Sequence, residues 1–182
     1  YYRVHAQSFG WLGWAKNGEP SGTAGLAKRL EGIQIVVLPA GSAAPSVNYA
    51  GVNVSGSAYR TRAYVNGTSS NSIVIPGYNN QPNVMYKTHV QSFGWEKSWK
   101  KDGQSSGTFG KAKRLEGIEI QLTGEVAKHY DVVYRVHCQT YGWMDWVKNG
   151  VMAGTSGQAK RLEGIEIKLV PKSQIVDMGV QY

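Results

Sequence analysis

The sequence has little of what several common classes of protein need. It holds one cysteine, Cys138, in 182 residues, so no disulfide can form within the chain. No apolar run is long enough to cross a membrane and no signal peptide is present, so we expect no membrane insertion. Acidic residues are scarce, 12 against 20 basic ones, and the net charge of +8 favours anionic partners. The basic residues are interspersed with glutamate and carry no recognition motif, so we expect no nucleic acid partner.

The sequence also lacks the patterns of a helical domain and of common enzymes. No segment of helical period lasts beyond a turn or two. There is no nucleophile triad, no phosphate-binding loop and no paired-cysteine site. We therefore expect a protein that is not an enzyme and that has no cofactor and no metal.

What the sequence has in abundance is repetition, which is the first feature to weigh in assigning a fold. The string G-x-A-K-R-L-E-G-I-x-I occurs at residues 25–35, 110–120 and 157–167. The similarity begins at a tyrosine in each copy, and Tyr86, Tyr134 and Tyr182 follow one another at intervals of 48 residues. Units this short, without a metal or a disulfide, are marginally stable alone, so we expect them to share one core.

These boundaries predict a single domain, which we expect to be a monomeric part of a larger protein. The domain spans residues 1–182, with repeat one at 2–38, an insert at 39–85, repeat two at 86–133 and repeat three at 134–181. The last four residues, GVQY (179–182), are predicted to supply the strand that precedes YRVH in repeat one and so to close the three units into a ring.

The repeats carry signals for short strands. In repeat three, Tyr134, Val136 and Cys138 alternate with Arg135 and His137, so the first set is predicted to face the core, with the cysteine a small core residue. Each repeat also holds a K-N-G or K-D-G triplet, typical of a tight turn because Asn, Asp and Gly tolerate positive φ. The pattern predicts an all-β fold: one closed pseudo-threefold domain, β-prism or β-trefoil-like, of three repeats of about 48 residues.

The insert departs from the repeat pattern. Two alternating runs in AYRTRAYVNGTSSNSIVI flank Asn66-Gly67 and predict a β-hairpin. The hairpin either covers a sheet edge or serves as a specificity loop, since only one of three otherwise equal repeats has it. In the second case Arg60, Arg62 and Tyr64 are the candidate contacts.

The combination Y-x-x-H-x-Q-x-x-G-W, then N-G, then G-T-x-G-x-x-K-R-L-E-G-I-x-I resembles the clostridial hydrophobic repeat with a conserved Trp, the ChW repeat family, in three copies. The matching residues of repeat three are Tyr134, His137, Gln139, Gly142-Trp143, Asn149-Gly150, Gly154-Thr155, Gly157 and Arg161-Leu162-Glu163. Repeat two departs by Asp102 in place of the asparagine and by one extra residue between Trp95 and Trp99. The resemblance implies extracellular proteins of Gram-positive bacteria, in which the repeats accompany adhesion modules or polysaccharide-degrading enzymes and bind rather than catalyse.

The tryptophans favour a binding role. All six lie in the repeats, two in each. Tryptophan offers a broad apolar face with a polar N–H, and sugars present C–H faces with many hydroxyls. We expect the first of each pair (Trp11, Trp95, Trp143) to pack in the core and the second to be exposed. The ligand-binding candidates are His5, Gln7, Trp14, Asn17, His89, Gln91, Trp99, Asp102, His137, Gln139, Trp146 and Asn149.

The recurring charged residues also have structural roles to fill. The repeated histidines, His5, His89 and His137, fall on the face opposite the apolar one, where we expect a structural hydrogen bond rather than a metal. Arg161 and Glu163 are expected to form a partly buried ion pair on the face that carries Ile165 and Ile167. Glycoside hydrolysis generally uses two carboxylates about 5 to 10 Å apart. Only one acidic position is the same in all three repeats, so a catalytic carboxylate is not expected.

Two classes of function are open. The first is a non-catalytic module that binds carbohydrate or cell-wall polysaccharide, secreted or on the surface of a Gram-positive bacterium, for adhesion or enzyme targeting. Its partner is a glycan, and an anionic wall polymer matches the charge. Several weak sites gain strength from multivalency. The alternative is a structural or protein-binding adhesion scaffold in which the insert meets a protein partner.

Overall fold

The computed structural model describes residues 1–47, 53–54, 63–64, 73–74 and 81–174. Its strands are β1 (Tyr2–Ala6), β2 (Gly10–Trp11), β3 (Ser21–Gly22), β4 (Leu30–Ile35), β5 (Ser46–Val47), β6 (Asn53–Val54), β7 (Ala63–Tyr64), β8 (Ile73–Val74), β9 (Val84–Val90), β10 (Gly94–Trp95), β11 (Lys100–Lys101), β12 (Ser106–Gly107), β13 (Leu115–Leu122), β14 (Tyr130–Cys138), β15 (Gly142–Trp143), β16 (Val147–Lys148), β17 (Ala153–Gly154) and β18 (Leu162–Pro171). One short helix, α1 (Val126–His129), is described. No helix in the described part of the chain is long and apolar enough to cross a membrane.

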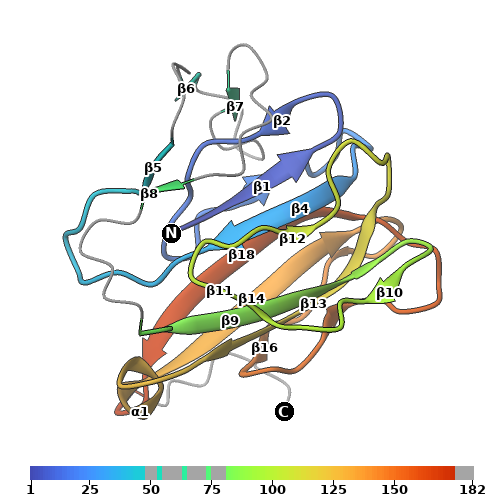
Figure 1. Ribbon diagram of the computed structural model, residues 1–182. Helices are drawn as coiled ribbons and strands as arrows, with labels where there is room; N and C mark the ends of the chain where they lie inside the picture. Colours follow the sequence, from blue (N-terminus) through green and yellow to red (C-terminus); the bar gives the residue numbers. More distant parts are fainter. Residues whose placement is uncertain (48–52, 55–62, 65–72, 75–80, 175–182) are drawn as a thin grey trace.

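Each repeat builds one antiparallel sheet around a pair of long strands (Figure 1). The pairs are β1 with β4, β9 with β13, and β14 with β18. The triplet that comes before β3, β12 or β17 forms the predicted tight turn in each repeat, with φ of 48°, 30° and 45° at Asn17, Asp102 and Asn149. The prediction of an all-β fold of three repeats is confirmed.

The sheets are joined by an exchange of short strands. In each sheet, one outer strand belongs to a different repeat. β12 of repeat two pairs with β4 of repeat one, β17 of repeat three pairs with β13 of repeat two, and β3 of repeat one pairs with β18 of repeat three. The order of exchange is therefore cyclic. Among the described residues the sheets stay separate and none closes on itself, so the β-prism and β-trefoil architectures remain predictions.

Side chains and turns strengthen the same contacts between repeats. The backbone N–H of Ile35 donates to the Tyr86 hydroxyl at 3.1 Å, and the N–H of Gly103 donates to the Ile35 carbonyl at 2.7 Å. The Tyr86 hydroxyl in turn donates to the carbonyl of Gln104. Burial raises the pKa of this phenol above its ordinary value, so it stays a neutral donor. Tyr134 makes the equivalent bond with Ile120, at 3.0 Å.

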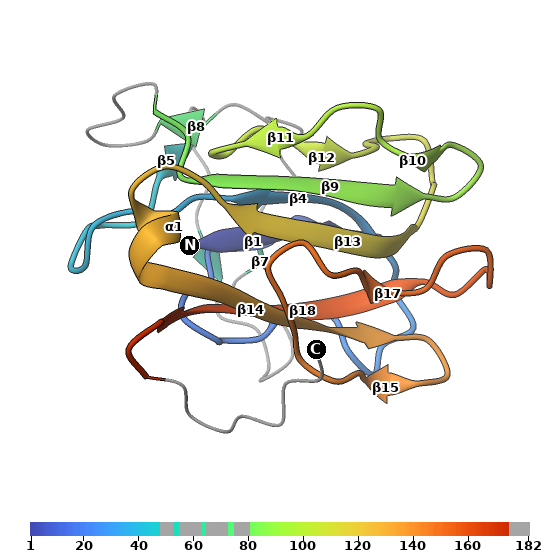
Figure 2. The same ribbon diagram turned by 90° about the horizontal axis from the view of Figure 1, so that it is seen from below.

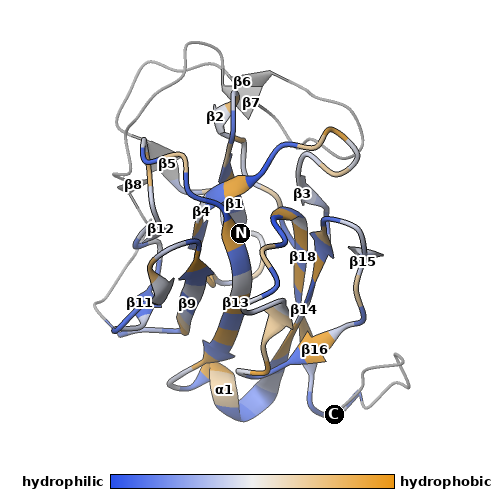
Figure 3. Cartoon of the chain, turned by 90° about the vertical axis from the view of Figure 1, so that its right-hand side faces the viewer, coloured by the Kyte–Doolittle hydropathy of each residue, from blue (hydrophilic) through white to orange (hydrophobic). Residues whose placement is uncertain are grey.

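A shared core lies between the three sheets. It draws Val4, Tyr86 and Val136 from the long strands of the three repeats, each fully buried. Hydrophobic and hydrophilic residues alternate along these strands (Figure 3). Cys138 is buried at the same place, as predicted, and burial raises the pKa of its thiol. The core therefore depends on all three repeats at once.

The K-R-L-E segment differs from its prediction in one respect. Leu162 pairs with Cys138 and Gly164 with His137, so the register shifts by one residue between them. This β-bulge leaves Glu163 on the outer face, while Leu162 joins the core. The expectation that Glu163 shares a face with Ile165 is therefore wrong, because simple alternation takes no account of a bulge.

The insert is described only in part. β7, which precedes Asn66-Gly67 in the sequence, pairs with β6, and β8, which follows it, pairs with β5. The residues around Asn66-Gly67 lie outside the described residues, so the predicted hairpin there stays a prediction. β7 lies next to β2, the edge strand of the first sheet, as the predicted edge cover would. The final GVQY lies outside the described residues.

Candidate functional site

Each sheet carries the same cluster of side chains on its outer face, away from the core. The long strands supply a cation, a histidine and two acidic or amide groups, and the short second strand and the turn after it supply two tryptophans. We call this cluster the tryptophan site. The three sites comprise Arg3, His5, Trp11, Trp14, Glu31 and Gln34; Lys87, His89, Trp95, Trp99, Glu116 and Glu119; and Arg135, His137, Trp143, Trp146, Glu163 and Glu166.

A cation lies between the two tryptophans of every site. From the cation to the first and second ring centroids, the distances are 4.5 and 5.1 Å for Arg3, 5.1 and 4.9 Å for Lys87, and 5.0 and 4.9 Å for Arg135. Each such contact contributes about 0.5–2 kcal/mol, more where water is excluded. The cation therefore fixes the orientation of both rings before any ligand arrives.

The residue directly across the strand pair holds the cation in place. Lys87 lies opposite Glu119, and their charged atoms are 2.9 Å apart. Arg135 lies opposite Glu166 at 2.7 Å, and Arg3 donates to the amide oxygen of Gln34 at 2.6 Å. Sites two and three thus carry a carboxylate beside the rings, where site one carries an amide.

The histidine of each site is held by the glutamate of the K-R-L-E segment. In each repeat the histidine Nδ1 lies 3.1 Å from one glutamate oxygen. The other oxygen accepts from the arginine two residues earlier, for example from Arg161 at 2.8 Å. The expected Arg161–Glu163 ion pair is therefore confirmed, and the structural hydrogen bond expected of the histidines stays a prediction. The imidazole of His137 stands edge-on to Trp143, with centroids 5.5 Å apart and planes at 83°.

The glycine after that glutamate lies directly against the first tryptophan. A Cβ at Gly117 would meet the ring of Trp95 at 3.5 Å, and one at Gly164 would meet Trp143 at 3.4 Å. The same two positions face backbone carbonyls of the exchanged strand, Thr155 and Ser21, at 3.1 and 3.5 Å. The E-G-I motif thus serves both the aromatic site and the contact between repeats.

The three sites differ in access. Trp11 and Trp14 are 0% and 5% exposed, and Arg3 is fully buried, whereas the tryptophans of repeats two and three are half-buried. The expectation that Trp14 is exposed is therefore wrong, as is full core burial of Trp95 and Trp143.

One cause is a side chain from repeat two, in addition to β7 of the insert, which also lies next to β2. Phe109 follows the exchanged strand β12, and its ring lies 5.4 Å from that of His5 and 5.2 Å from that of Trp11. The segments that lie over sites two and three carry Ser156 and Ala24 at this position, too small to cover a tryptophan. Site one is thus closed and sites two and three are open.

The other predicted candidates lie away from the tryptophan rings. Gln7, Gln91 and Gln139 begin the turns after the long strands, where their backbone N–H groups donate to Arg29, Arg114 and Arg161. Asp102 accepts hydrogen bonds from the backbone N–H groups of Asn83 and Val84, and Asn149 from that of Val132. Asp102 and Asn149 therefore anchor the beginnings of β9 and β14.

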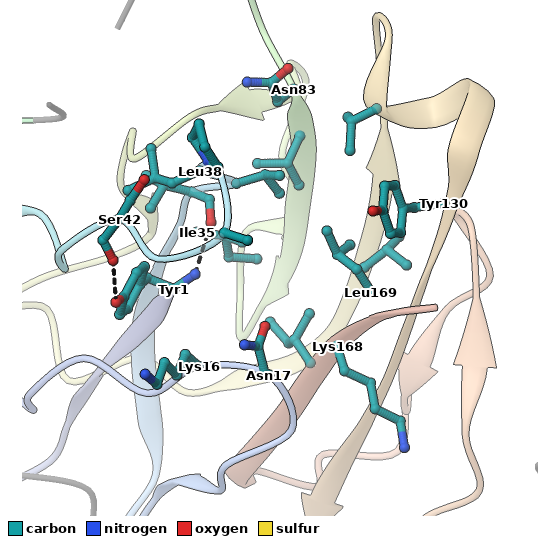
Figure 4. Close-up of a pocket in the computed structure, with 18 of the residues that line it drawn as sticks. Tyr1, Lys16, Asn17, Ile35, Leu38, Ser42, Asn83, Tyr130, Lys168 and Leu169 are labelled. Atoms are coloured by element: carbon teal, nitrogen blue, oxygen red, sulfur yellow. Dashed lines mark hydrogen bonds between the residues drawn. The ribbon is translucent and has the colours of Figure 1, made fainter. Parts of the chain in front are cut away.

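Asn17 lies at a cavity at the end of the molecule where the long strands begin (Figure 4). The cavity measures about 870 Å³ and has an apolar floor that includes Ile35 and Leu169, with Lys16 and Lys168 at its side. The candidate histidines (His5, His89 and His137) and the tryptophans lie elsewhere, so the structure divides the predicted set between two regions. In the insert, Arg60 and Arg62 lie outside the described residues, and Tyr64 lies in β7.

The closed site offers a direct test of its carboxylate. Burial alone would raise the pKa of Glu31, but hydrogen bonds from His5 and Arg29 outweigh it and hold the pKa below its usual value of 4.5. A carboxyl whose pKa is lower in the folded protein than in the unfolded one stabilises the fold at pH values above its unfolded-state pKa. That stabilisation disappears as the pH falls through its folded-state pKa.

We therefore expect Glu31→Gln to lower the free energy of unfolding by about 2 kcal/mol at pH 7 and by much less at pH 3. Urea unfolding at several pH values measures both. Glu125→Gln is the matched control, because Glu125 pairs with Lys128 and both side chains are 71% exposed; it should change stability little at either pH. A loss that is equal at pH 7 and pH 3 would contradict the assignment.

Comparison with known proteins agrees with the repeat structure. The family model described as Clostridial hydrophobic W matches residues 5–39, 89–124 and 137–171, which is more than half of the chain. The chain belongs to this family. No curated protein and no solved structure matches it. The predicted resemblance to three ChW repeats is confirmed.

The ChW segments contain the tryptophans and the His–Glu–Arg cluster but not the cation between the rings. Arg3, Lys87 and Arg135 each lie two residues before a matched segment. Reasoning from sequence missed these cations and the carboxylates Glu119 and Glu166. A signal was available, since each cation shares the histidine's strand face and the acidic position recurs in G-I-E-I.

Proposed function

We propose that the chain is a non-catalytic binding module of the bacterial cell surface, whose second and third ChW repeats each bind carbohydrate of a cell-wall or similar polysaccharide. The observation that supports this most is the half-exposed tryptophan pair, held by its own cation, in repeats two and three. A ring fixed in this way stacks on the C–H face of a sugar at little cost in side-chain entropy.

Polar groups beside the rings suit the hydroxyls of a sugar. Glu119 and Glu166 are each partly exposed, at 20% and 12% of the side chain, and their carboxylates accept from O–H donors. The half-buried His89 and His137 hold Nδ1 toward a glutamate, which leaves the opposite edge of each ring for a ligand. Two such sites on one chain raise the strength of binding to a repeating polymer.

The experiment is an array of purified glycans, including Gram-positive wall polysaccharides, probed with labelled wild-type protein and with Trp99→Ala, Trp146→Ala and the double variant. We expect each single variant to weaken array binding by about tenfold or more, and the double variant to abolish it. On a soluble oligosaccharide of the glycan that binds, the wild type should take up two per chain and each single variant one.

Tyr130→Ala is the control, because it removes a 38%-exposed aromatic side chain from the end of the molecule that holds the cavity. It should leave binding unchanged, and circular dichroism confirms that all variants are folded. The proposal would be contradicted if the wild type bound no glycan on the array, or if the double variant still bound. Either result would favour a scaffold that meets a protein through its insert.

A further inference from the structure

A second surface of the molecule carries uncompensated positive charge. It lies at the end where β1, β9 and β14 finish, opposite α1 and the cavity; Figure 2 shows the turns after β9 and β14 gathered on one side and α1 on the other. Here a lysine of each repeat approaches a hydroxyl. The Nζ-to-Oγ distances are 3.4 Å from Lys28 to Ser8, 3.0 Å from Lys113 to Ser92 and 3.1 Å from Lys160 to Thr140. We call this surface the basic end.

The charge of these lysines is not neutralised by the protein. None of the three forms an ion pair with a carboxylate in the part of the chain that the structure describes. The nearby arginines differ, because each shares its guanidinium with the glutamate of its own K-R-L-E segment, as Arg114 does with Glu116 at 2.8 Å. Lys111, which lies over the ring of Phe93 at 5.3 Å, adds a fourth positive charge.

Each lysine–hydroxyl pair is a donor set for an anionic oxygen. An ammonium has three N–H donors, and one of them donates to the hydroxyl oxygen. The other two N–H groups and the O–H of the hydroxyl remain as donors for a ligand. Charge-assisted bonds of this kind suit phosphate and carboxylate oxygens. The same chemistry recurs in all three repeats, so the basic end can hold several anionic groups at once.

The backbone that presents the hydroxyls is strained. Ser8, Ser92 and Thr140 have φ of 70°, 70° and 77°, a region that costs a non-glycine residue energy and is exceptional for a β-branched threonine. Glycine would relieve this strain at every one of the three positions, yet a hydroxyl-bearing residue stands at each. Exposed aromatic rings flank two of the pairs, since Phe93 is 58% and Tyr141 is 53% exposed.

We propose that the basic end binds an anionic glycopolymer through its repeated phosphodiester or carboxylate groups, with Phe93 and Tyr141 packing on the uncharged units between them. This site is separate from the tryptophan sites and does not rest on the function proposed for them. Its partner is a chain of regularly spaced anions, because three equivalent donor sets on one surface match a repeating ligand better than a single small anion.

The test compares two triple variants of equal charge. Lys28→Gln/Lys113→Gln/Lys160→Gln removes the donor sets, and Lys16→Gln/Lys101→Gln/Lys128→Gln removes exposed lysines toward the other end; each lowers the net charge from +8 to +5. The probes are poly(glycerol phosphate) and polygalacturonate, which separate phosphodiester from carboxylate recognition. A single-stranded oligothymidylate serves as a phosphodiester polyanion that has no free hydroxyl groups along its backbone.

We expect the wild type to bind one of the two glycopolymers more tightly than oligothymidylate, with an affinity that falls as NaCl is raised. The donor-set variant should lose more than about tenfold in affinity, and the charge-matched control less than about threefold. Trp99→Ala/Trp146→Ala should keep this binding. The outcome for the basic end can therefore be told apart from the outcome for the tryptophan sites. Equal losses in the two triple variants, no binding to either glycopolymer, or equal binding of oligothymidylate would overturn the proposal.

A second variant tests the strained hydroxyls. Ser92→Gly/Thr140→Gly should raise the melting temperature, because glycine adopts positive φ without a steric penalty. The same variant should weaken glycopolymer binding by about threefold or more, because two hydroxyl donors are lost. A raised melting temperature with unchanged affinity would show that the hydroxyls take no part.

Discussion

Gly107→Ala is expected to lower the free energy of unfolding by about 3–5 kcal/mol, which is most of the stability of a typical domain. Gly107 has φ of 104° and belongs to β12, the strand that repeat two places on the sheet of repeat one. An added Cβ would come closer than 3.0 Å to the carbonyl oxygen of Glu31 and to the Cα of Gly32. Both are backbone atoms of β4, so neither can move without breaking the pairing.

Gly110→Ala provides the matched control for this prediction. Its φ is 67°, but a Cβ there would meet nothing within 4 Å. It should cost about 1 kcal/mol, the ordinary penalty for a side chain at positive φ. Urea unfolding of both variants separates the steric clash from the backbone preference. Similar losses in the two variants would show that the close approach of β12 to β4 contributes little.

The cyclic exchange explains why such a small strand matters so much. Each of β3, β12 and β17 has two residues, too few to form a stable sheet alone. Each nevertheless supplies the contact that ties one repeat to another, and Gly22 and Gly154 make the same close approach as Gly107. Loss of one contact separates two of the three sheets and exposes part of the core that all three share, so the repeats should unfold together.

The sequence was sufficient to predict the repeats, the strand alternation and the tight turns, because each leaves a local pattern. The alternation around Val136 and His137 follows directly from the two-residue period of a strand. The exchange of strands could not be predicted in this way. A two-residue strand such as Ser106–Gly107 is too short to show a period, and no local sequence pattern indicates which repeat it pairs with.

The different exposure of the three tryptophan sites depends on that exchange, so local sequence patterns could not predict it. Trp11 and Trp14 look like their counterparts in the other repeats, yet Phe109, 95 or more positions away in the sequence, covers their site. The candidate Asn17 was grouped with the tryptophans because it recurs with them, whereas recurrence shows only that a position matters to every repeat. In repeats two and three that position anchors a strand through Asp102 or Asn149.

Repeat two has a polar contact where repeat three has an apolar one. The Glu96 carboxylate accepts from the backbone N–H of Thr88 at 3.0 Å, from the Ser106 hydroxyl and from the N–H of Gly107 at 3.2 Å. Thr88 and Ser106 are fully buried, and Glu96 is 17% exposed. The equivalent residues of repeat three are the apolar set Val136, Met144 and Ala153.

Glu96→Ala is expected to lower the free energy of unfolding by about 2–4 kcal/mol, because it opens a cavity beside the buried Thr88 and Ser106 hydroxyls and removes a charged acceptor that both of them contact. The triple variant Thr88→Val/Glu96→Met/Ser106→Ala, which copies repeat three, should recover stability to within about 1 kcal/mol of the wild type. Urea unfolding of the two variants measures the difference. If the triple variant is no more stable than Glu96→Ala, the carboxylate contributes more than local hydrogen-bond satisfaction. Recovery would show that a ChW repeat accepts either a polar or an apolar set of side chains at this position. The condition is that every buried side-chain donor has a hydrogen-bond acceptor or is replaced by an apolar group.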